Sequence, residues 1–131
     1  MFDDINFGGD LLNIDFSQSP NLEEISFENC SIINVVNVTF GSKVKYVNFA
    51  KNKIYRYEQV KYLNDEAIEL DLSSNNFNHL YGFDFTNANF KEINLINNPN
   101  MQDISNCLTS WPLQKQTDEI ENKLLVNIDS A

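Results

Sequence analysis

The sequence holds few of the side chains from which catalytic or metal sites are usually built. His79 is its only histidine, so neither an HExxH zinc motif nor a histidine-rich metal site can form. Cys30 and Cys107 lie far apart in the chain, and neither belongs to a CxxC pair. We therefore expect His79 to be structural or solvated, and Cys30 to have a structural role.

Carboxylates are plentiful but do not fall into a known reactive arrangement. Asp3, Asp4, Asp10 and Asp15 lack the spacing of an EF-hand calcium loop. The adjacent glutamates at 23–24 would point to opposite sides of a strand, unlike the two carboxylates of a glycosidase. The chain also lacks a P-loop and a GxGxxG fingerprint. We expect no catalytic residues, no metal and no cofactor, and hence a protein that is not an enzyme.

The composition describes one acidic domain that can bury a core. The chain has 131 residues, 42% of them hydrophobic, and its 9 Lys and Arg against 19 Asp and Glu give a net charge of −10. This charge repels nucleic acid and anionic membrane surfaces. No apolar run is long enough for a transmembrane helix, and the first residues do not read as a signal peptide. We expect a cytoplasmic protein with no nucleic-acid partner and no membrane insertion.

A leucine-rich pattern recurs along the chain. The template L-x-x-L-x-L-x-x-N/C-x-L fits at every position of 22–32, 44–54 and 67–77, where Ala67 is a small first residue. It also fits 90–98 up to the asparagine. Successive units begin 22 or 23 residues apart. The middle of each unit alternates apolar and polar residues with a period of two, which is typical of a half-buried strand.

Some segments fit the pattern outside this spacing. The segments starting at Leu11 and Met101 each begin eleven residues from a full unit. A chain cannot leave a sheet and return to it within eleven residues, so we expect one member of each pair to lie on the opposite side. A weaker unit begins the chain, with Phe2, Ile5, Phe7 and Leu12 at its apolar positions and Asp10 at the asparagine position.

These repeats resemble the leucine-rich repeat family over roughly residues 2–110. The resemblance implies an α/β fold, namely a leucine-rich-repeat solenoid with a parallel concave β-sheet and an irregular convex side. It places a structural asparagine ladder where each strand ends, because an amide can both donate to and accept from unpaired backbone groups of adjacent turns. The ladder residues would be Cys30, Asn52, Asn75 and Asn98.

The segments between and after the strands should differ from one another. Residues 33–40 are rich in β-branched side chains and should be extended. Residues 57–63 space their apolar side chains by three and predict a short helix or 3₁₀ turn. Residues 118–127 carry capping-box spacing and predict a short C-terminal capping helix. We therefore divide the chain into a solenoid of about four to five turns at 1–112 and a C-terminal cap or tail at 113–131.

The concave strand face is the candidate binding surface. Two outward columns, defined by the repeat, would line it with Glu24, Tyr46, Glu69, Glu92 and with Ser26, Asn48, Asp71, Asn94. The first hypothesis is a non-enzymatic protein–protein interaction module or adaptor that binds a partner with a basic segment through this face. The alternative is a fragment of a larger leucine-rich-repeat protein, such as an extracellular recognition receptor, in which these turns are structural. In that case the location would be extracellular.

Charge is zoned along the chain. Residues 1–30 carry seven acidic residues and no Lys or Arg, whereas residues 43–61 hold six of the nine basic residues. In a solenoid these blocks become slabs, which predicts a basic waist between acidic ends. The waist could be neutralised by the neighbouring turns, could bind an acidic segment, or could join another copy's acidic end. The sequence shows no N-terminal cap, so self-association through that edge is a further possibility.

Overall fold

The protein is a stack of parallel β-strands. The computed structural model describes residues 1–77, 88–99 and 125–127. In chain order its elements are β1 (Asp10–Asp15), the 3₁₀ helix η1 (Phe16–Gln18), β2 (Glu24–Ser26), β3 (Asn34–Phe40), β4 (Tyr46–Asn48), β5 (Arg56–Tyr62), β6 (Ile68–Asp71), β7 (Phe90–Asn94) and β8 (Leu125–Asn127).

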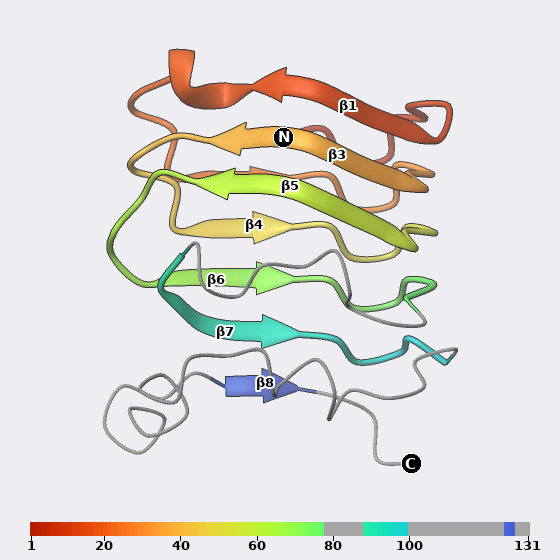
Figure 1. Ribbon diagram of the computed structural model, residues 1–131. Helices are drawn as coiled ribbons and strands as arrows, with labels where there is room; N and C mark the ends of the chain where they lie inside the picture. The colour runs from red at the N-terminus through yellow and green to blue at the C-terminus, as the bar shows by residue number, and fades with distance from the viewer. Residues whose placement is uncertain (78–87, 100–124, 128–131) are drawn as a thin grey trace.

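These strands form two sheets. Strands β1, β3 and β5 make a three-stranded sheet, and β2, β4, β6, β7 and β8 make a five-stranded sheet. From β1 to β6 the chain alternates between the sheets, so it winds into a parallel-strand β-solenoid of about three turns. Figure 1 shows the three-stranded sheet nearer to the viewer, with the strands of the two sheets pointing in opposite directions.

The five-stranded sheet has the register expected from the repeat. Ile25 pairs with Val47, Val47 with Leu70, Leu70 with Ile93, and Ile93 with Val126. The prediction that units start at 22, 44, 67 and 90 is therefore confirmed. The segment at Leu11 lies in β1 of the other sheet, as the eleven-residue argument requires.

The three-stranded sheet corrects the expectation of an irregular convex side. Residues 33–40 are largely extended as predicted, but residues 57–63 were expected to be helical and, up to Tyr62, belong to β5. Each strand of this sheet has one residue with a left-handed backbone near its middle, namely Asn13, Asn37 or Gln59, with φ of 56°, 56° and 52°. This residue shifts the alternation by one position, so that Tyr57, Val60 and Tyr62 all point inward. Spacing by three was therefore misread as a helical period.

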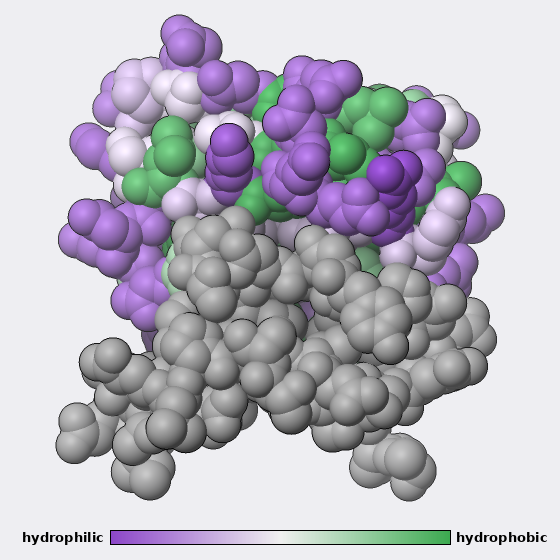
Figure 2. Space-filling model, in the orientation of Figure 1, coloured by the Kyte–Doolittle hydropathy of each residue, from purple (hydrophilic) through white to green (hydrophobic). Residues whose placement is uncertain are grey.

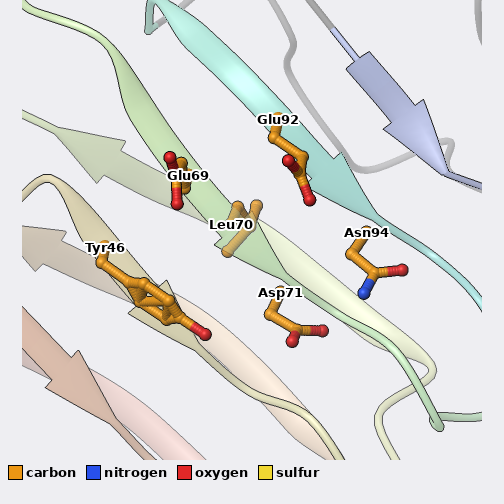
Figure 3. A pocket seen from close by; sticks show the side chains of 6 residues that line it. All are labelled: Tyr46, Glu69, Leu70, Asp71, Glu92 and Asn94. Atoms are coloured by element: carbon orange, nitrogen blue, oxygen red, sulfur yellow. The ribbon is translucent and has the colours of Figure 1, made fainter.

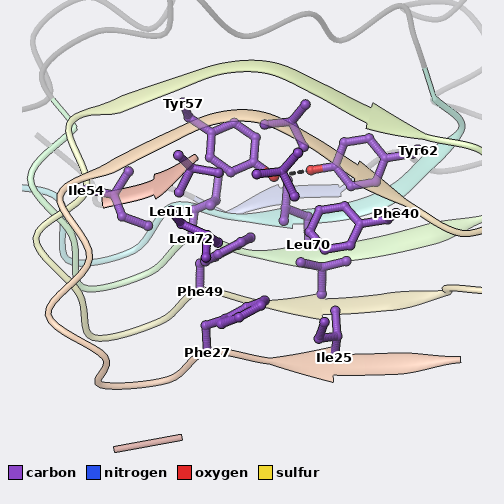
Figure 4. Close-up of a cluster of buried hydrophobic side chains, with 14 of the residues drawn as sticks. Leu11, Ile25, Phe27, Phe40, Phe49, Ile54, Tyr57, Tyr62, Leu70 and Leu72 are labelled. Carbon is purple, nitrogen blue, oxygen red and sulfur yellow. Dashed lines mark hydrogen bonds between the residues drawn. The ribbon is translucent and has the colours of Figure 1, made fainter. Parts of the chain in front are cut away.

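The core lies between the two sheets and is rich in aromatic rings. One stack runs through Phe2, Phe27 and Phe49, with ring centroids 5.0 and 5.1 Å apart. A second stack, against the three-stranded sheet, joins Phe16, Phe40 and Tyr62 at 5.7 and 5.4 Å. Figure 4 shows Phe27 and Phe49 reaching from one sheet toward Tyr57 and Phe40 of the other. Neither sheet could bury its apolar face alone, so the two sheets stabilise each other.

The first turn differs from the expected alignment. Phe2 was aligned with Leu22, but its ring stacks on Phe27 and its N–H donates to the carbonyl of Ser26 at 2.9 Å. Phe2 therefore takes the position of Phe27, 25 residues earlier in the chain. The predicted first unit therefore has the wrong register.

The end of the chain also differs from expectation. Leu125–Asn127 were placed in a capping helix but form β8, which pairs in parallel with β7. The remainder of that predicted helix lies outside the described residues. Within the described ranges the secondary structure consists of strands and the short helix η1, so this part of the chain is a β-solenoid rather than an α/β fold.

Candidate functional site

The outer side of the five-stranded sheet carries the eight residues predicted for the binding face, here called the acidic face. The register places Glu24, Tyr46, Glu69 and Glu92 in one row across the strands, and Ser26, Asn48, Asp71 and Asn94 in a second row. Seven of the eight predicted residues are at least partly exposed on this surface, whereas Ser26 is buried. The backbone of Leu125 and Asn127 in β8 continues the two rows.

The second row has a structural role at the end of each strand. The side-chain oxygens of Asn48, Asp71 and Asn94 each accept a hydrogen bond from the N–H two residues later, at 2.8, 2.9 and 3.1 Å. These Asx turns favour Asn and Asp at this position. The row is therefore polar for a local backbone reason as well as for any binding role.

At the end of β2, the corresponding backbone N–H donates to a residue of the preceding turn instead. The Ser26 hydroxyl donates to Asp3, and the same carboxylate accepts from the N–H of Glu28 at 3.0 Å. Sequence analysis weighed Asp3 only as a calcium ligand and missed this contact. The signal was the serine itself, because it stands where the other strands have Asn or Asp.

Tyr46 lies in a shallow depression of the acidic face. Tyr46, Glu69, Leu70, Asp71, Glu92 and Asn94 line this depression, and Figure 3 shows the Tyr46 side chain extending from β4 toward Asp71 on β6. Partial burial raises the pKa of the Tyr46 phenol above 10, and the charges of Asp71, Glu69, Glu28 and Glu24 raise it further. The carboxylates around Tyr46 make this depression negative, and a negative depression would attract a cation.

Two lysines stand at the margin of this face. Lys91 pairs with Glu69 at 3.4 Å, and Lys45 pairs with Glu23 at 3.4 Å. All four side chains are about half exposed or more, so each pair is open to water and screened by salt. Neither lysine occupies a position in the two rows, and the rows keep an excess of acidic groups.

Behind the strands, the asparagine ladder lies inside the solenoid. Asn52 is buried, accepts from the N–H groups of Cys30 and Ile32 at 2.8 and 3.0 Å, and donates to the carbonyls of Phe27 and Phe49 at 2.9 Å. Each such amide therefore ties its own turn to the preceding one.

The next turns repeat this arrangement. Asn75 accepts from the N–H of Ile54 at 2.9 Å and donates to the carbonyl of Phe49 at 2.9 Å. Asn98 accepts from the N–H of Phe77 and donates to the carbonyl of Leu72, both at 3.1 Å. Because these amides are enclosed, they hold the strands in place and offer nothing to a ligand.

Cys30 occupies the ladder position in the first of these turns. Its thiol is buried and lies 2.9 Å from the carbonyl of Phe2, to which it can donate. Burial raises the pKa of the Cys30 thiol above 9, which disfavours the reactive thiolate. Cys107 and His79 lie outside the described residues, as does any contact between the two cysteines.

Asn64 is a buried amide that sequence analysis did not single out. It donates to the carbonyl of Val44 at 2.9 Å and accepts from the N–H of Glu66 at 2.8 Å, which fixes the loop before β6. It does not repeat in the other described turns, so periodicity gave no signal for it.

The basic residues at 43–61 are distributed around one turn of the solenoid rather than gathered into a patch. Lys45 and Lys51 pair with Glu23 and Glu28 of the preceding turn at 3.4 and 3.5 Å. These contacts agree with one of the alternatives for the basic waist, namely neutralisation by a neighbouring turn. Arg56 pairs with Glu58 of its own strand at 3.0 Å. The basic waist is therefore partly neutralised by acidic side chains of its own turn and of the preceding one.

Two further kinds of feature, metal-ligand clusters and membrane-spanning helices, are not found in the described part of the chain. Within residues 1–77, 88–99 and 125–127, no three His, Cys, Asp or Glu side chains converge so that they could hold a metal ion. No helix in those ranges is long and apolar enough to span a bilayer. Comparison with protein-family models, curated proteins and solved structures finds no match to this chain.

Proposed function

We propose that this protein is a non-enzymatic interaction module of the leucine-rich-repeat kind, and that its acidic face binds a protein partner through a basic segment. The single observation that carries the proposal is the aligned surface of Glu24, Glu69, Asp71 and Glu92 around Tyr46. The buried asparagine ladder supports the kinship with leucine-rich repeats, because it satisfies the backbone where each strand ends.

The arrangement of the acidic groups suits an extended partner. Parallel strands lie about 4.8 Å apart, so rows of side chains cross the sheet at this spacing. A chain laid across the strands would meet carboxylates of successive turns, while Tyr46 offers a ring face on which a cation can rest. Each exposed pair contributes little alone, so we expect several basic side chains to act together.

A labelled peptide of alternating Lys and Ser is a direct probe of this surface. We expect fluorescence anisotropy at low salt to show binding, and the double reversal Glu24→Lys/Glu92→Lys to weaken it by about tenfold or more. These two glutamates lie on β2 and β7, so the double reversal changes the charge at two separate strands of the acidic face. Binding should also weaken as salt is added, since the charges are exposed.

The matched control moves the same charge elsewhere. Asp65→Lys/Glu66→Lys changes the net charge by the same amount in an exposed loop before β6. We expect this variant to keep most of the peptide affinity. Equal weakening in both variants would mean that net charge, rather than the acidic face, attracts the peptide, and the proposal would fail.

A further inference from the structure

The outer side of the three-stranded sheet has a charge pattern that changes from strand to strand. Its register places Asp10, Asn34 and Arg56 in one row, and Asp15, Thr39 and Lys61 in another. In both rows the acidic member lies on β1, the neutral member on the central strand β3, and the basic member on β5. The four charged side chains belong to exposed residues. A third row between them holds Leu12, Val36 and Glu58, so β5 also carries one carboxylate.

The middle of this surface carries no charge. Val36 and Thr39 of β3 point outward and are half-buried by their neighbours, and the exposed Asn37 donates to Asn13 at 2.8 Å. Figure 2 shows the face that includes this sheet, with isolated hydrophobic residues among mostly hydrophilic ones in the described part. A neutral central strand can therefore face another neutral surface without charge repulsion.

We propose that this surface, here called the graded face, docks against the same face of a second copy of the chain. A two-fold axis along β3 places β1 of each copy opposite β5 of the other. Asp10 then faces Arg56 of the second copy, and Asp15 faces Lys61 of the second copy. The two-fold symmetry repeats both pairs, which gives four contacts of opposite charge around a neutral centre.

Local contacts leave these side chains able to take part. Asp10 accepts from the Asn34 amide at 2.8 Å, and Asp15 accepts from the N–H of Ser17 at 2.8 Å, so each carboxylate is oriented but retains acceptor capacity. The Nε of Arg56 is bound to Glu58, while a guanidinium carries further donors. No ion pair joins Lys61 to a residue of the described ranges.

Other occupants fit the graded face less well. A basic segment would meet Arg56 and Lys61 of β5, where Glu58 is already paired with Arg56, and an acidic segment would meet Asp10 and Asp15 of β1. The same face turned about β3 places opposite charges together at both edges. Three strands of about 20 Å cover only about 300 Å² on each copy, well below the roughly 800 Å² per partner of a stable interface. The expected dimer is therefore weak and concentration-dependent. The charged contacts of the dimer are shorter than the Debye length of about 8 Å at physiological salt, so they are only partly screened. The repulsion between the two acidic molecules acts over longer distances and is largely screened.

Complementary charge reversal tests the proposal by sedimentation equilibrium of the full chain. One variant is Asp10→Lys/Asp15→Lys and the other is Arg56→Glu/Lys61→Glu. We expect wild type to self-associate, and each variant alone to lose at least about tenfold in affinity. In an equimolar mixture the two variants should form a heterodimer, because each now carries the charges that the other lacks.

Several results would overturn the proposal. The proposal fails if wild type sediments as a monomer at the highest concentration, or if the mixture of the two double variants does not associate. It also fails if either double variant alone associates as strongly as wild type. Asp15→Lys removes the cap of η1, so the single swap of Asp10→Lys mixed with Arg56→Glu provides a second test that leaves this cap intact. Binding of the Lys–Ser peptide to the acidic face should not change in these variants, which separates this inference from the proposed function.

Discussion

The two sheets of this solenoid join successive turns in different ways. The five-stranded sheet uses strands of three to five residues, and buried amides tie its turns together where the strands end. The three-stranded sheet uses strands of six or seven residues, each with a left-handed residue near its middle. Side-chain amides at the strand ends thus help to hold the turns of the five-stranded sheet together. The three-stranded sheet relies on longer ladders of backbone hydrogen bonds.

The difference explains which sheet the sequence makes visible. Buried amides demand Asn or a close substitute, so they leave a column of identical residues in the sequence. A left-handed residue asks only for a tolerated backbone conformation, which Asn adopts readily and Gln59 also adopts here. The first requirement is chemical and specific, whereas the second is conformational and permissive.

The largest expected effect is the loss of a buried amide from the five-stranded sheet. Asn52→Ala leaves the N–H groups of Cys30 and Ile32 and the carbonyls of Phe27 and Phe49 without this partner. We expect the free energy of unfolding to fall by about 3–5 kcal/mol, since each buried group left unpaired costs about 1–3 kcal/mol and some will relax. Urea denaturation measures the loss.

The control for this substitution lies in the same turn. Asn48→Ala removes one Asx-turn bond at the surface and should cost about 0.5–1.5 kcal/mol. If both variants lost the same stability, the buried ladder would not be what ties the turns of this sheet together.

A smaller effect is expected in the three-stranded sheet at the left-handed position of β3. Asn37 has φ of 56°, where a β-branched side chain clashes with the backbone. We expect Asn37→Val to lower stability by about 1–2 kcal/mol. Asn37→Gly loses the same side-chain bond to Asn13 but tolerates this φ, so it should retain more stability in the same urea titration. A valine variant as stable as the glycine variant would contradict the importance of the kink.

The smallest effect at neutral pH concerns two phenols on the inner side of β5. Tyr57 and Tyr62 are buried and hydrogen-bonded to each other, as Figure 4 shows. Replacing Tyr57 with Phe removes this bond and should cost about 1 kcal/mol near pH 7. Thermal unfolding measured at neutral pH would give this value, and a much larger loss would show that the pair organises the core.

These phenols also predict a dependence on alkaline pH. Burial raises the pKa of Tyr57 and of Tyr62 above the ordinary value of 10. Their contribution to stability is therefore complete below the unfolded pKa of about 10 and is lost as the pH rises through the folded values. We expect the unfolding temperature of wild type to fall above about pH 10, more steeply than that of Tyr57→Phe/Tyr62→Phe. Parallel curves for the two proteins would rule out this linkage.

The candidate site was predictable from sequence to the extent that it follows the repeat. Glu24, Glu69 and Glu92 could be aligned because they stand at a fixed offset from apolar residues that must face the core. Asp3 could not be assigned in this way, because its contact with Ser26 depends on how the first turn closes. Asn64 was missed for a similar reason, since its partners belong to one loop and do not repeat.

The sequence by itself determined β2, β4, β6 and β7 of the five-stranded sheet, their register and the column of buried amides, because period-two burial and an amide requirement repeat every 22 or 23 residues. Only the tertiary structure decided that the other side is also a sheet, and that Leu125–Asn127 pair with β7. The left-handed kink moves inward residues from a spacing of two to a spacing of three, which imitates a helix along the sequence. Pairing with β3 makes Arg56–Tyr62 a strand, since each turn takes its backbone partners from its neighbour in the stack.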